Sequence, residues 1–102
     1  MFTYVTARVI CSAVYPYIVL YTNKAWTIAT QYEQHEVAGK NLNILHGELT
    51  DVNAIAQMMH NVRFTGFGEA KVINYTKSGV AFSNDISIQP LVSRYVLNST
   101  TF

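Results

Sequence analysis

The segment EAKVINYTKSGVAFSNDISIQP, which runs from Glu69 to Pro90, decides the fold. Apolar and polar residues alternate on both sides of Lys77-Ser78-Gly79, and this triplet has the composition of a tight turn. We therefore predict a strand, a turn and a second strand. The final segment RYVLNSTTF, residues 94–102, predicts one more strand.

The alternation also assigns the side chains of these strands to two faces. Asn74 falls on the face opposite the charged Glu69 and Lys71, and Asn84 shares its face with apolar residues. The apolar neighbours are Ala70 and Val72 beside Asn74, and Phe82, Ile86 and Ile88 beside Asn84. A buried amide without partners costs about 1–3 kcal/mol. The two asparagines therefore predict a polar ligand, an ordered water, or hydrogen bonds to each other and to the backbone of the helical segment.

The opposite face of the same sheet is partly apolar. Ile73 and Tyr75, together with Tyr95 and Leu97 of the last strand, are predicted to lie there. Apolar residues gathered on an outer face usually contact a partner or a flanking helix. We therefore predict that these residues form an interface.

The residues before Glu69 predict two strands and several helices. The predicted elements are strands over residues 5–13 and 18–21, a helix over residues 24–30 capped by Thr22-Asn23, and short helical turns over residues 33–37 and 41–45. Strands, then helices, then strands indicate an α+β fold with an antiparallel sheet and helices on one face.

The longest predicted helix covers residues 51–62, with Thr50 as its N-cap. Its apolar residues form one stripe, which predicts packing on the core. They are Ala54, Ile55, Met58, Met59 and Val62. The alternative is that Met58 and Met59 also line a ligand cavity.

Length and composition indicate one globular domain over residues 1–102. Half of the residues are hydrophobic and 13% are charged, which excludes a disordered chain. The apolar runs are too interrupted for a membrane span, and a net charge of +1 gives no field that attracts nucleic acid or an anionic membrane. The single cysteine, Cys11, favours a reducing, intracellular setting.

Patterns typical of catalysis or metal binding are missing from the sequence. No nucleophile–base pair or pair of carboxylates stands out, so we do not expect an enzyme. His35, His46 and His60 lack the spacing of metal ligands. We predict that His46 and His60 lie at the surface near helix ends, and that no histidine lies on a core face where it would bind haem.

Three segments in this order resemble a PAS domain, most closely the LOV branch of flavin-binding blue-light receptors. They are YPYIVLYTNKAW, GKNLNILHGELTD and VINYTKSGVAFSNDISIQP. The resemblance implies a five-stranded antiparallel sheet in the order 2-1-5-4-3, with helices that enclose a ligand on its inner face. It also implies that this domain is part of a larger signalling or regulatory protein.

The LOV resemblance assigns roles to several positions. Leu42 stands where the flavin-reactive cysteine is expected, so no cysteinyl–flavin adduct forms there, and Cys11 on the first strand is not assumed to replace it. Asn74 and Asn84 match the asparagines that hold the flavin edge. Four other positions differ from the LOV pattern. Asn43 and Met59 stand where it has the two phosphate-binding arginines. His46 stands where its loop has a glutamine, and Thr100 where its last strand has a glutamine.

Loss of both arginines weakens phosphate binding. Hydrogen bonds to charged groups contribute roughly 1.5–3 kcal/mol each, so the affinity for flavin mononucleotide is expected to fall by orders of magnitude, and that for riboflavin less. The resemblance thus limits a ligand site to Asn41, Leu42, Leu45, Met59, Asn74, Asn84 and Thr100.

The resemblance favours a non-catalytic PAS module that mediates protein association and signal relay, in signalling or transcriptional regulation. Its partner would be another PAS domain, identical or different, or a flanking effector domain. No resident cofactor is expected. The alternative is a receptor for flavin or another flat polar molecule held by Asn74 and Asn84. A third hypothesis is a structural domain with a filled core.

Overall fold

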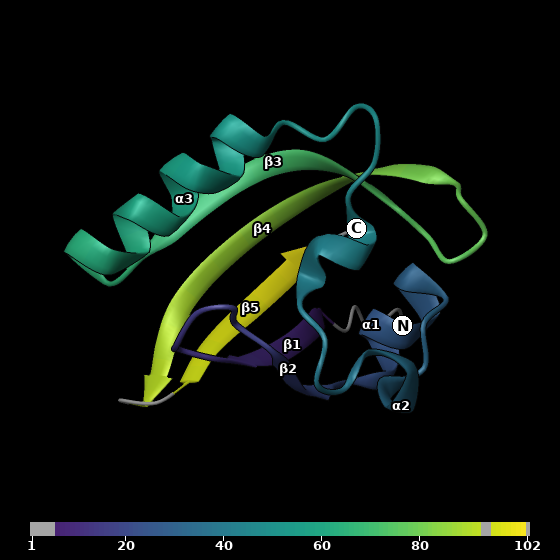
Figure 1. Ribbon diagram of the computed structural model, residues 1–102, viewed down its shortest axis with the longest axis horizontal. Coiled ribbons are helices and arrows are strands. Elements are labelled where there is room, and N and C mark those ends of the chain that lie inside the picture. Colours follow the sequence, from purple (N-terminus) through teal and green to yellow (C-terminus); the bar gives the residue numbers. More distant parts are fainter. Residues whose placement is uncertain (1–5, 93–94, 102) are drawn as a thin grey trace, which may run out of the picture.

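The computed structural model describes residues 6–92 and 95–101, and the side chains of residues 6–90. These residues form a five-stranded antiparallel sheet in the order β2-β1-β5-β4-β3, which is the predicted order. The strands are β1 (Ala7–Ser12), β2 (Val19–Thr22), β3 (Gly68–Tyr75), β4 (Ala81–Val92) and β5 (Tyr95–Thr101). Figure 1 shows that the sheet is strongly curved.

Four helical segments connect β2 to β3. They are α1 (Lys24–Thr30), α2 (Gln34–Val37), the 3₁₀ helix η1 (Leu42–Leu45) and α3 (Val52–Thr65). Asn23 caps α1, because its side chain accepts a hydrogen bond from the backbone N of Trp26 at 3.0 Å. In Figure 1, α1 and α2 lie near β1 and β2, whereas α3 runs along β3 at the other end of the sheet.

The helix α3 begins one residue later and ends three residues later than the sequence predicts. Its N-cap is Asp51, whose side chain accepts hydrogen bonds from the backbone N of Asn53 at 3.0 Å and of Ala54 at 3.1 Å. Gly66 ends the helix in the left-handed region, with φ of 79°.

The prediction of Thr50 as the N-cap of α3 is wrong. The Thr50 hydroxyl accepts a hydrogen bond from the backbone N of Gly47 at 2.9 Å and donates one to the carbonyl O of Ile73 at 2.6 Å. This side chain therefore ties the loop before α3 to the edge strand β3.

The pairing of β3 with β4 fixes which side chains face the helices. Val72 lies opposite Asn84, and Asn74 lies opposite Phe82. Asn74 is 2% exposed and Asn84 is 1% exposed, whereas Lys71 is exposed. The strand alternation therefore predicts the inner face of both strands correctly.

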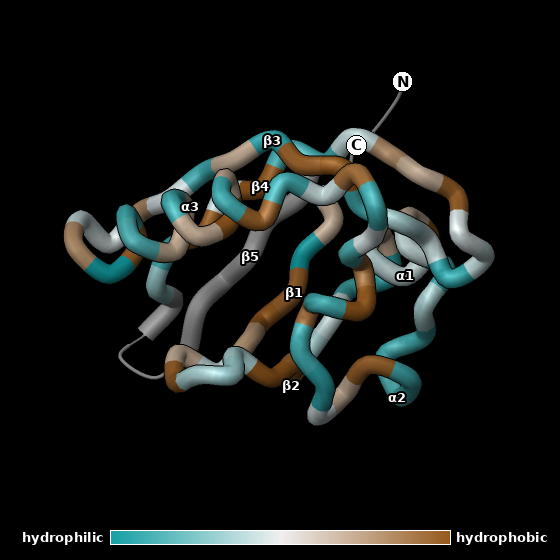
Figure 2. Tube along the Cα trace, turned by 45° about the horizontal axis from the view of Figure 1, so that its top comes forward, coloured by the Kyte–Doolittle hydropathy of each residue, from teal (hydrophilic) through white to brown (hydrophobic). Residues whose placement is uncertain are grey.

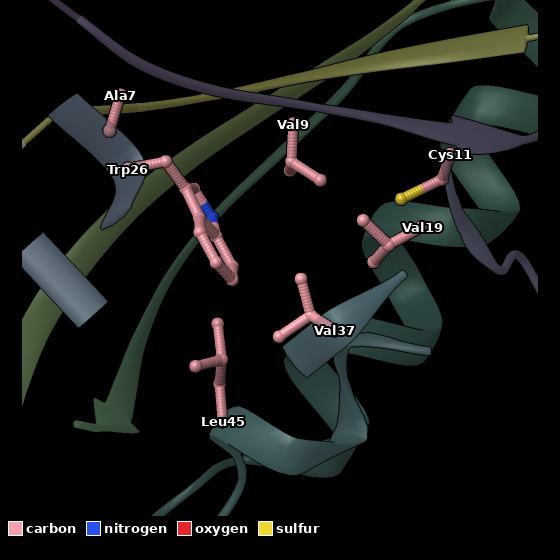
Figure 3. Close-up of a cluster of buried hydrophobic side chains, with 7 residues drawn as sticks. All are labelled: Ala7, Val9, Cys11, Val19, Trp26, Val37 and Leu45. Carbon is pink, nitrogen blue, oxygen red and sulfur yellow. The ribbon is translucent and has the colours of Figure 1, made fainter. Parts of the chain in front are cut away.

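Two clusters of buried apolar side chains cover this inner face within the described residues. The first consists of Ala7, Val9, Cys11, Val19, Trp26, Val37 and Leu45. Figure 3 shows the indole of Trp26 reaching from α1 toward Leu45 of η1, with Val9 of β1 beside it. The first cluster thus joins α1, α2 and η1 to β1 and β2.

The second cluster joins α3 to β3 and β4. Its buried members are Met58, Val72, Ile86 and Ile88, with Ala54, Ile55, Met59, Val62 and Ala70 packed against them. The predicted apolar stripe of α3 is therefore confirmed as a core-facing stripe. Gly68 permits the close approach of helix and strand, because a Cβ there would lie 2.3 Å from the carbonyl O of Met58.

Hydrophobic residues are spread over short segments rather than one long run, and Figure 2 shows them on parts of β1, β2, β4 and α3. In the part of the chain that the structure describes, no helix combines the length and the apolar character needed to cross a membrane.

Candidate functional site

A cavity of about 140 Å³ lies between the inner face of the sheet, η1 and α3. Its walls are mainly apolar, with Trp26, Leu42, Leu45, Ile55, Met58 and Met59 from the helices and Ile86 and Ile88 from β4. Both hydrophobic clusters border it. The cavity therefore lies between the two clusters, where their side chains leave space unfilled.

Six of the seven residues that the sequence assigns to ligand binding line this one cavity. They are Asn41, Leu42, Leu45, Met59, Asn74 and Asn84. The seventh, Thr100, pairs in β5 with Ala7 and Ile86, and its side chain lies outside the described residues. The structure brings the candidates together, and their binding role stays a prediction.

The two buried asparagines bond to each other and to η1. Asn84 Nδ2 donates a hydrogen bond to Asn74 Oδ1 at 2.8 Å, and Asn74 Nδ2 donates one to the carbonyl O of Leu45 at 3.3 Å. A third, longer bond runs from Asn74 Nδ2 to the carbonyl O of Ile73 at 3.4 Å. The pair thus holds the 3₁₀ helix against the sheet.

The Asn84 side chain is incompletely satisfied. Its Oδ1 is buried and accepts no hydrogen bond from any described residue. An unpaired buried acceptor costs about 1–3 kcal/mol, and a ligand or an ordered water that donates to it would recover that free energy. Because Asn84 lines the cavity, this oxygen is the clearest polar feature that a ligand could satisfy.

The start of η1 uses its polar side chain for its own structure. Asn41 Oδ1 accepts a hydrogen bond from the backbone N of Asn43 at 2.9 Å and so caps the helix. Leu42 and Asn43, the next two residues, both line the cavity. The wall contains an aliphatic side chain at Leu42, the position that the LOV resemblance assigns to a cysteine.

His46 directly follows η1 and lines the cavity with a partly exposed side chain, so the prediction of a surface group near a helix end holds only in part. Its side chain is half-buried, and burial lowers the pKa of its imidazole from the ordinary value of 6.5. His60 is exposed, as predicted, and its ring lies 4.4 Å from that of Phe64. The segment between η1 and α3 has no periodicity from which the position of His46 follows.

Cys11 is a cavity residue that the sequence reasoning did not assign. It is 4% exposed and lines the cavity from β1, and burial raises the pKa of its thiol to about 12. The alternation of β1 could have identified it, because Ala7, Val9 and Cys11 share the buried face. A neutral thiol at this position is a poor nucleophile.

Pro16 and Tyr17 of the β1–β2 connection also line the cavity. Tyr17 has φ of 61°. The rings of Tyr15 and Tyr17 pack edge to face, with 5.9 Å between the ring centroids. The sequence predicts a break in the strand here but gives no sign that the connection folds over the cavity.

The described lining residues include no lysine, arginine, aspartate or glutamate. Groups of three or more metal-binding side chains are likewise not found among the residues that the structure describes. The cavity therefore offers no charged partner for a phosphate.

Ile73 and Tyr75 of the predicted interface are not among the residues that line the cavity. Tyr75 contacts the loop before α3: its hydroxyl accepts a hydrogen bond from the backbone N of Leu49 at 3.0 Å. A Cβ on Gly47 would lie 2.2 Å from the Tyr75 ring, so this loop crosses directly over the ring. Ile73 is half-buried, on the strand face opposite Asn74. The side chains of Tyr95 and Leu97 in β5 lie outside those described.

No family model matches the chain, but the similar sequences and the similar solved structures both come from blue-light receptors. A blue-light photoreceptor of Listeria innocua is 27% identical over 73 residues, which cover 72% of this chain and 29% of that protein. The chain thus spans less than a third of the length of the curated relatives it matches first.

Solved structures resemble the chain over nearly all of its length. The LOV domain from a blue-light activated histidine kinase of Erythrobacter litoralis has a TM-score of 0.86 and 25% identity, with 94% of each chain covered. The light-state dimer of the fungal blue-light photoreceptor Vivid has a TM-score of 0.84 and 21% identity, over 95% of this chain and 77% of that one. At 21% identity, the similarity to Vivid shows a shared fold and nothing more.

Proposed function

Because this chain has the PAS fold and is similar to LOV domains in sequence and in structure, we propose that it is a non-catalytic sensory and interaction module. It passes a signal by associating with a second PAS domain or with an effector domain, in signalling or transcriptional regulation. It does so without cysteinyl–flavin photochemistry.

One observation carries this proposal. The wall of the cavity holds Leu42 at the position where the resemblance expects the reactive cysteine. Cys11 also lines the cavity, but it lies on β1 rather than at the start of η1, where the resemblance expects the reactive cysteine. Blue-light adduct formation therefore lacks its nucleophile.

Phosphate anchoring is also weak in this cavity. Asn43 and Met59, at the positions of the two expected arginines, both line it and carry no charge. Flavin mononucleotide would leave its phosphate without a charge-assisted contact. We propose that the domain holds no resident flavin.

The outer sheet face is the proposed association surface. It includes Ile73 and Tyr75, and a protein with net charge +1 has little long-range repulsion to keep copies apart. A protein of similar fold has been solved as a light-state dimer. The effector domain would lie elsewhere in the parent protein, just as the solved LOV domain that is similar to this chain comes from a histidine kinase. The parent protein would be intracellular, either cytoplasmic or nuclear.

The test is sedimentation velocity at low to high micromolar concentration. We expect the sedimentation coefficient to rise with concentration for the parent protein and to stay at the monomer value for Ile73→Lys. Val80→Lys, at an exposed position in the β3–β4 turn, is the matched control and should associate like the parent. A parent protein that stays monomeric, or an Ile73→Lys variant that associates equally well, would contradict the proposal.

A second candidate function is a small-molecule receptor, and the unpaired Oδ1 of Asn84 beside the cavity favours it. We expect thermal unfolding to shift upward with a bound ligand. Riboflavin, flavin mononucleotide and flavin adenine dinucleotide are tested first, together with the visible absorption spectrum. A flat spectrum and no thermal shift would remove flavins from the candidate ligands.

A further inference from the structure

We propose that the cavity binds a neutral, single-ring aromatic compound that carries one hydrogen-bond donor, with the donor bonded to Asn84 Oδ1. The inference rests on the receptor function proposed above and specifies its ligand class. Size, wall chemistry, hydrogen bonding and charge each limit the ligand independently.

The size of the cavity limits the ligand to about one ring. Its volume is about 140 Å³. An engineered apolar cavity of about 150 Å³ in another protein binds benzene, whereas pockets for drug-sized ligands occupy about 300–1,000 Å³. A single six-membered ring matches this volume, whereas a three-ring flavin would extend beyond it.

The walls favour an aromatic ring over a sugar or another polyol. Met58 and Met59 present thioethers, and methionine sulfur makes favourable contacts with aromatic rings. Trp26, Ile55 and Ile86 add apolar surface. A polyol would lose several hydrogen bonds to water on entering such walls without replacement.

Hydrogen bonding favours a ligand that places one donor at Asn84 Oδ1. The Oδ1 atoms of Asn74 and Asn41 already accept hydrogen bonds, from Asn84 Nδ2 and from the backbone N of Asn43. Asn84 Oδ1 is buried and without a donor among the described residues. A ligand with one O–H or N–H at this end of the cavity satisfies it.

Charge excludes anionic ligands. The lining described above contains no cationic side chain. Burial lowers the pKa of His46 and raises that of Cys11 to about 12, so both groups are neutral near pH 7. A carboxylate or a phosphate would lose its hydration without gaining a counter-charge.

The experiment compares phenol with toluene, which have nearly the same shape and differ by a hydroxyl in place of a methyl group. The dissociation constants of both are measured by NMR titration for the parent protein and for Asn84→Leu. We expect the toluene dissociation constant divided by the phenol dissociation constant to be at least tenfold lower for Asn84→Leu than for the parent protein. A tenfold change corresponds to about 1.4 kcal/mol. Asn53→Leu, at an exposed position on α3, is the matched control and should leave the ratio unchanged.

Two measurements on the parent protein keep the inference testable if Asn84→Leu does not fold. At equal occupancy, the side-chain amide resonances of Asn84 should shift more with phenol, which bonds to Oδ1, than with toluene, which contributes only its ring current. The dissociation constant of 4-hydroxybenzoate, which adds a carboxylate to phenol, should exceed that of phenol at least tenfold.

Three results would overturn the inference: no phenol binding at millimolar concentration, an unchanged ratio in a folded Asn84→Leu variant, or 4-hydroxybenzoate binding as tightly as phenol. If riboflavin binds and phenol does not, the ligand class is wrong and the receptor function stands. If neither phenol nor any flavin binds, the receptor function fails as well, and sedimentation alone decides the interaction function.

Discussion

At the scale of single residues, the hydrogen bond between Asn74 and Asn84 should be visible as non-additive stability. Asn84→Leu leaves Asn74 Oδ1 unpaired, and Asn74→Leu leaves the carbonyl O of Leu45 and Asn84 Nδ2 without this partner. We expect each single variant to lose about 1–3 kcal/mol of the free energy of unfolding. The double variant should lose less than the sum, because fewer groups remain unpaired.

Urea unfolding of the four proteins in this cycle measures the coupling. Strict additivity would mean that the two amides do not depend on each other, and would count against a structural role for their bond.

His46 should make the stability of the domain depend on pH. Burial lowers its pKa in the folded state, so the unfolded chain binds the proton first as the pH falls below about 6.5. The free energy of unfolding should therefore decrease from neutral pH toward the folded pKa. Urea unfolding at about pH 7.5 and about pH 5.5 measures this decrease, and His46→Gln should reduce it. An equal decrease in the variant would locate the titrating group elsewhere.

The sequence predicts the buried asparagines but not the whole cavity wall. Strand alternation predicts that Asn74 and Asn84 are buried. Once the charged residues Glu69 and Lys71 are placed on the face toward water, a period of two leaves only the inner face for Asn74. His46 and Tyr17 lie in connections without a repeating pattern. Their positions depend on how the connections cross the sheet, and residue spacing contains no information on that.

At the scale of elements, Asp51 should contribute to the stability of α3. Its side chain accepts hydrogen bonds from the backbone N of Asn53 and of Ala54. Asp51→Ala should lower the free energy of unfolding by about 1 kcal/mol. Asp51→Asn retains a capping oxygen and should lose much less. The two variants are compared by urea unfolding, and equal losses would contradict the capping role.

Thr50 and Asp51 show why the sequence misplaces the start of this helix by one residue. Both residue types are good N-caps, so the local pattern does not distinguish them. Tertiary contacts decide which of the two residues caps the helix. The Thr50 hydroxyl is already hydrogen-bonded to the backbone of Gly47 and of Ile73, so Asp51 is the N-cap.

The loop before α3 should tolerate no side chain at Gly47. A Cβ there would lie 2.2 Å from the ring of Tyr75. We expect Gly47→Ala to destabilise the domain by about 1–3 kcal/mol, as overpacking does. In a Tyr75→Ala background the same substitution should cost much less. Thermal unfolding of the four proteins tests this, and an equal loss in both backgrounds would show that the ring is not the obstacle.

At the scale of the whole molecule, Cys11 should report on global opening of the core. Its side chain is 4% exposed, and burial raises the pKa of its thiol to about 12, so little of the reactive thiolate forms at about pH 8. Alkylation by iodoacetamide should be slow in the native protein and fast in urea. Mass spectrometry measures both rates, and rapid native alkylation would show that β1 opens locally.

The order of strands lies beyond what alternation can predict. The pattern of residues 69–102 predicts three strands and residues 5–21 predict two more, but many sheet orders are compatible with five strands. The order β2-β1-β5-β4-β3 was predicted only through the PAS resemblance, which the solved LOV domain of similar fold supports.

The loop from Gly47 to Asp51 has a thermodynamic consequence for the whole domain. It begins beside His46 in the cavity wall, and it is bonded to Tyr75 and Ile73 of the proposed association surface. If a bound molecule moves this loop, it changes the affinity for a docked partner by some factor. Reciprocity then requires the docked partner to change the affinity for the bound molecule by the same factor. Measuring either affinity with and without the other component therefore determines one coupling free energy, in whichever direction the signal runs in the cell.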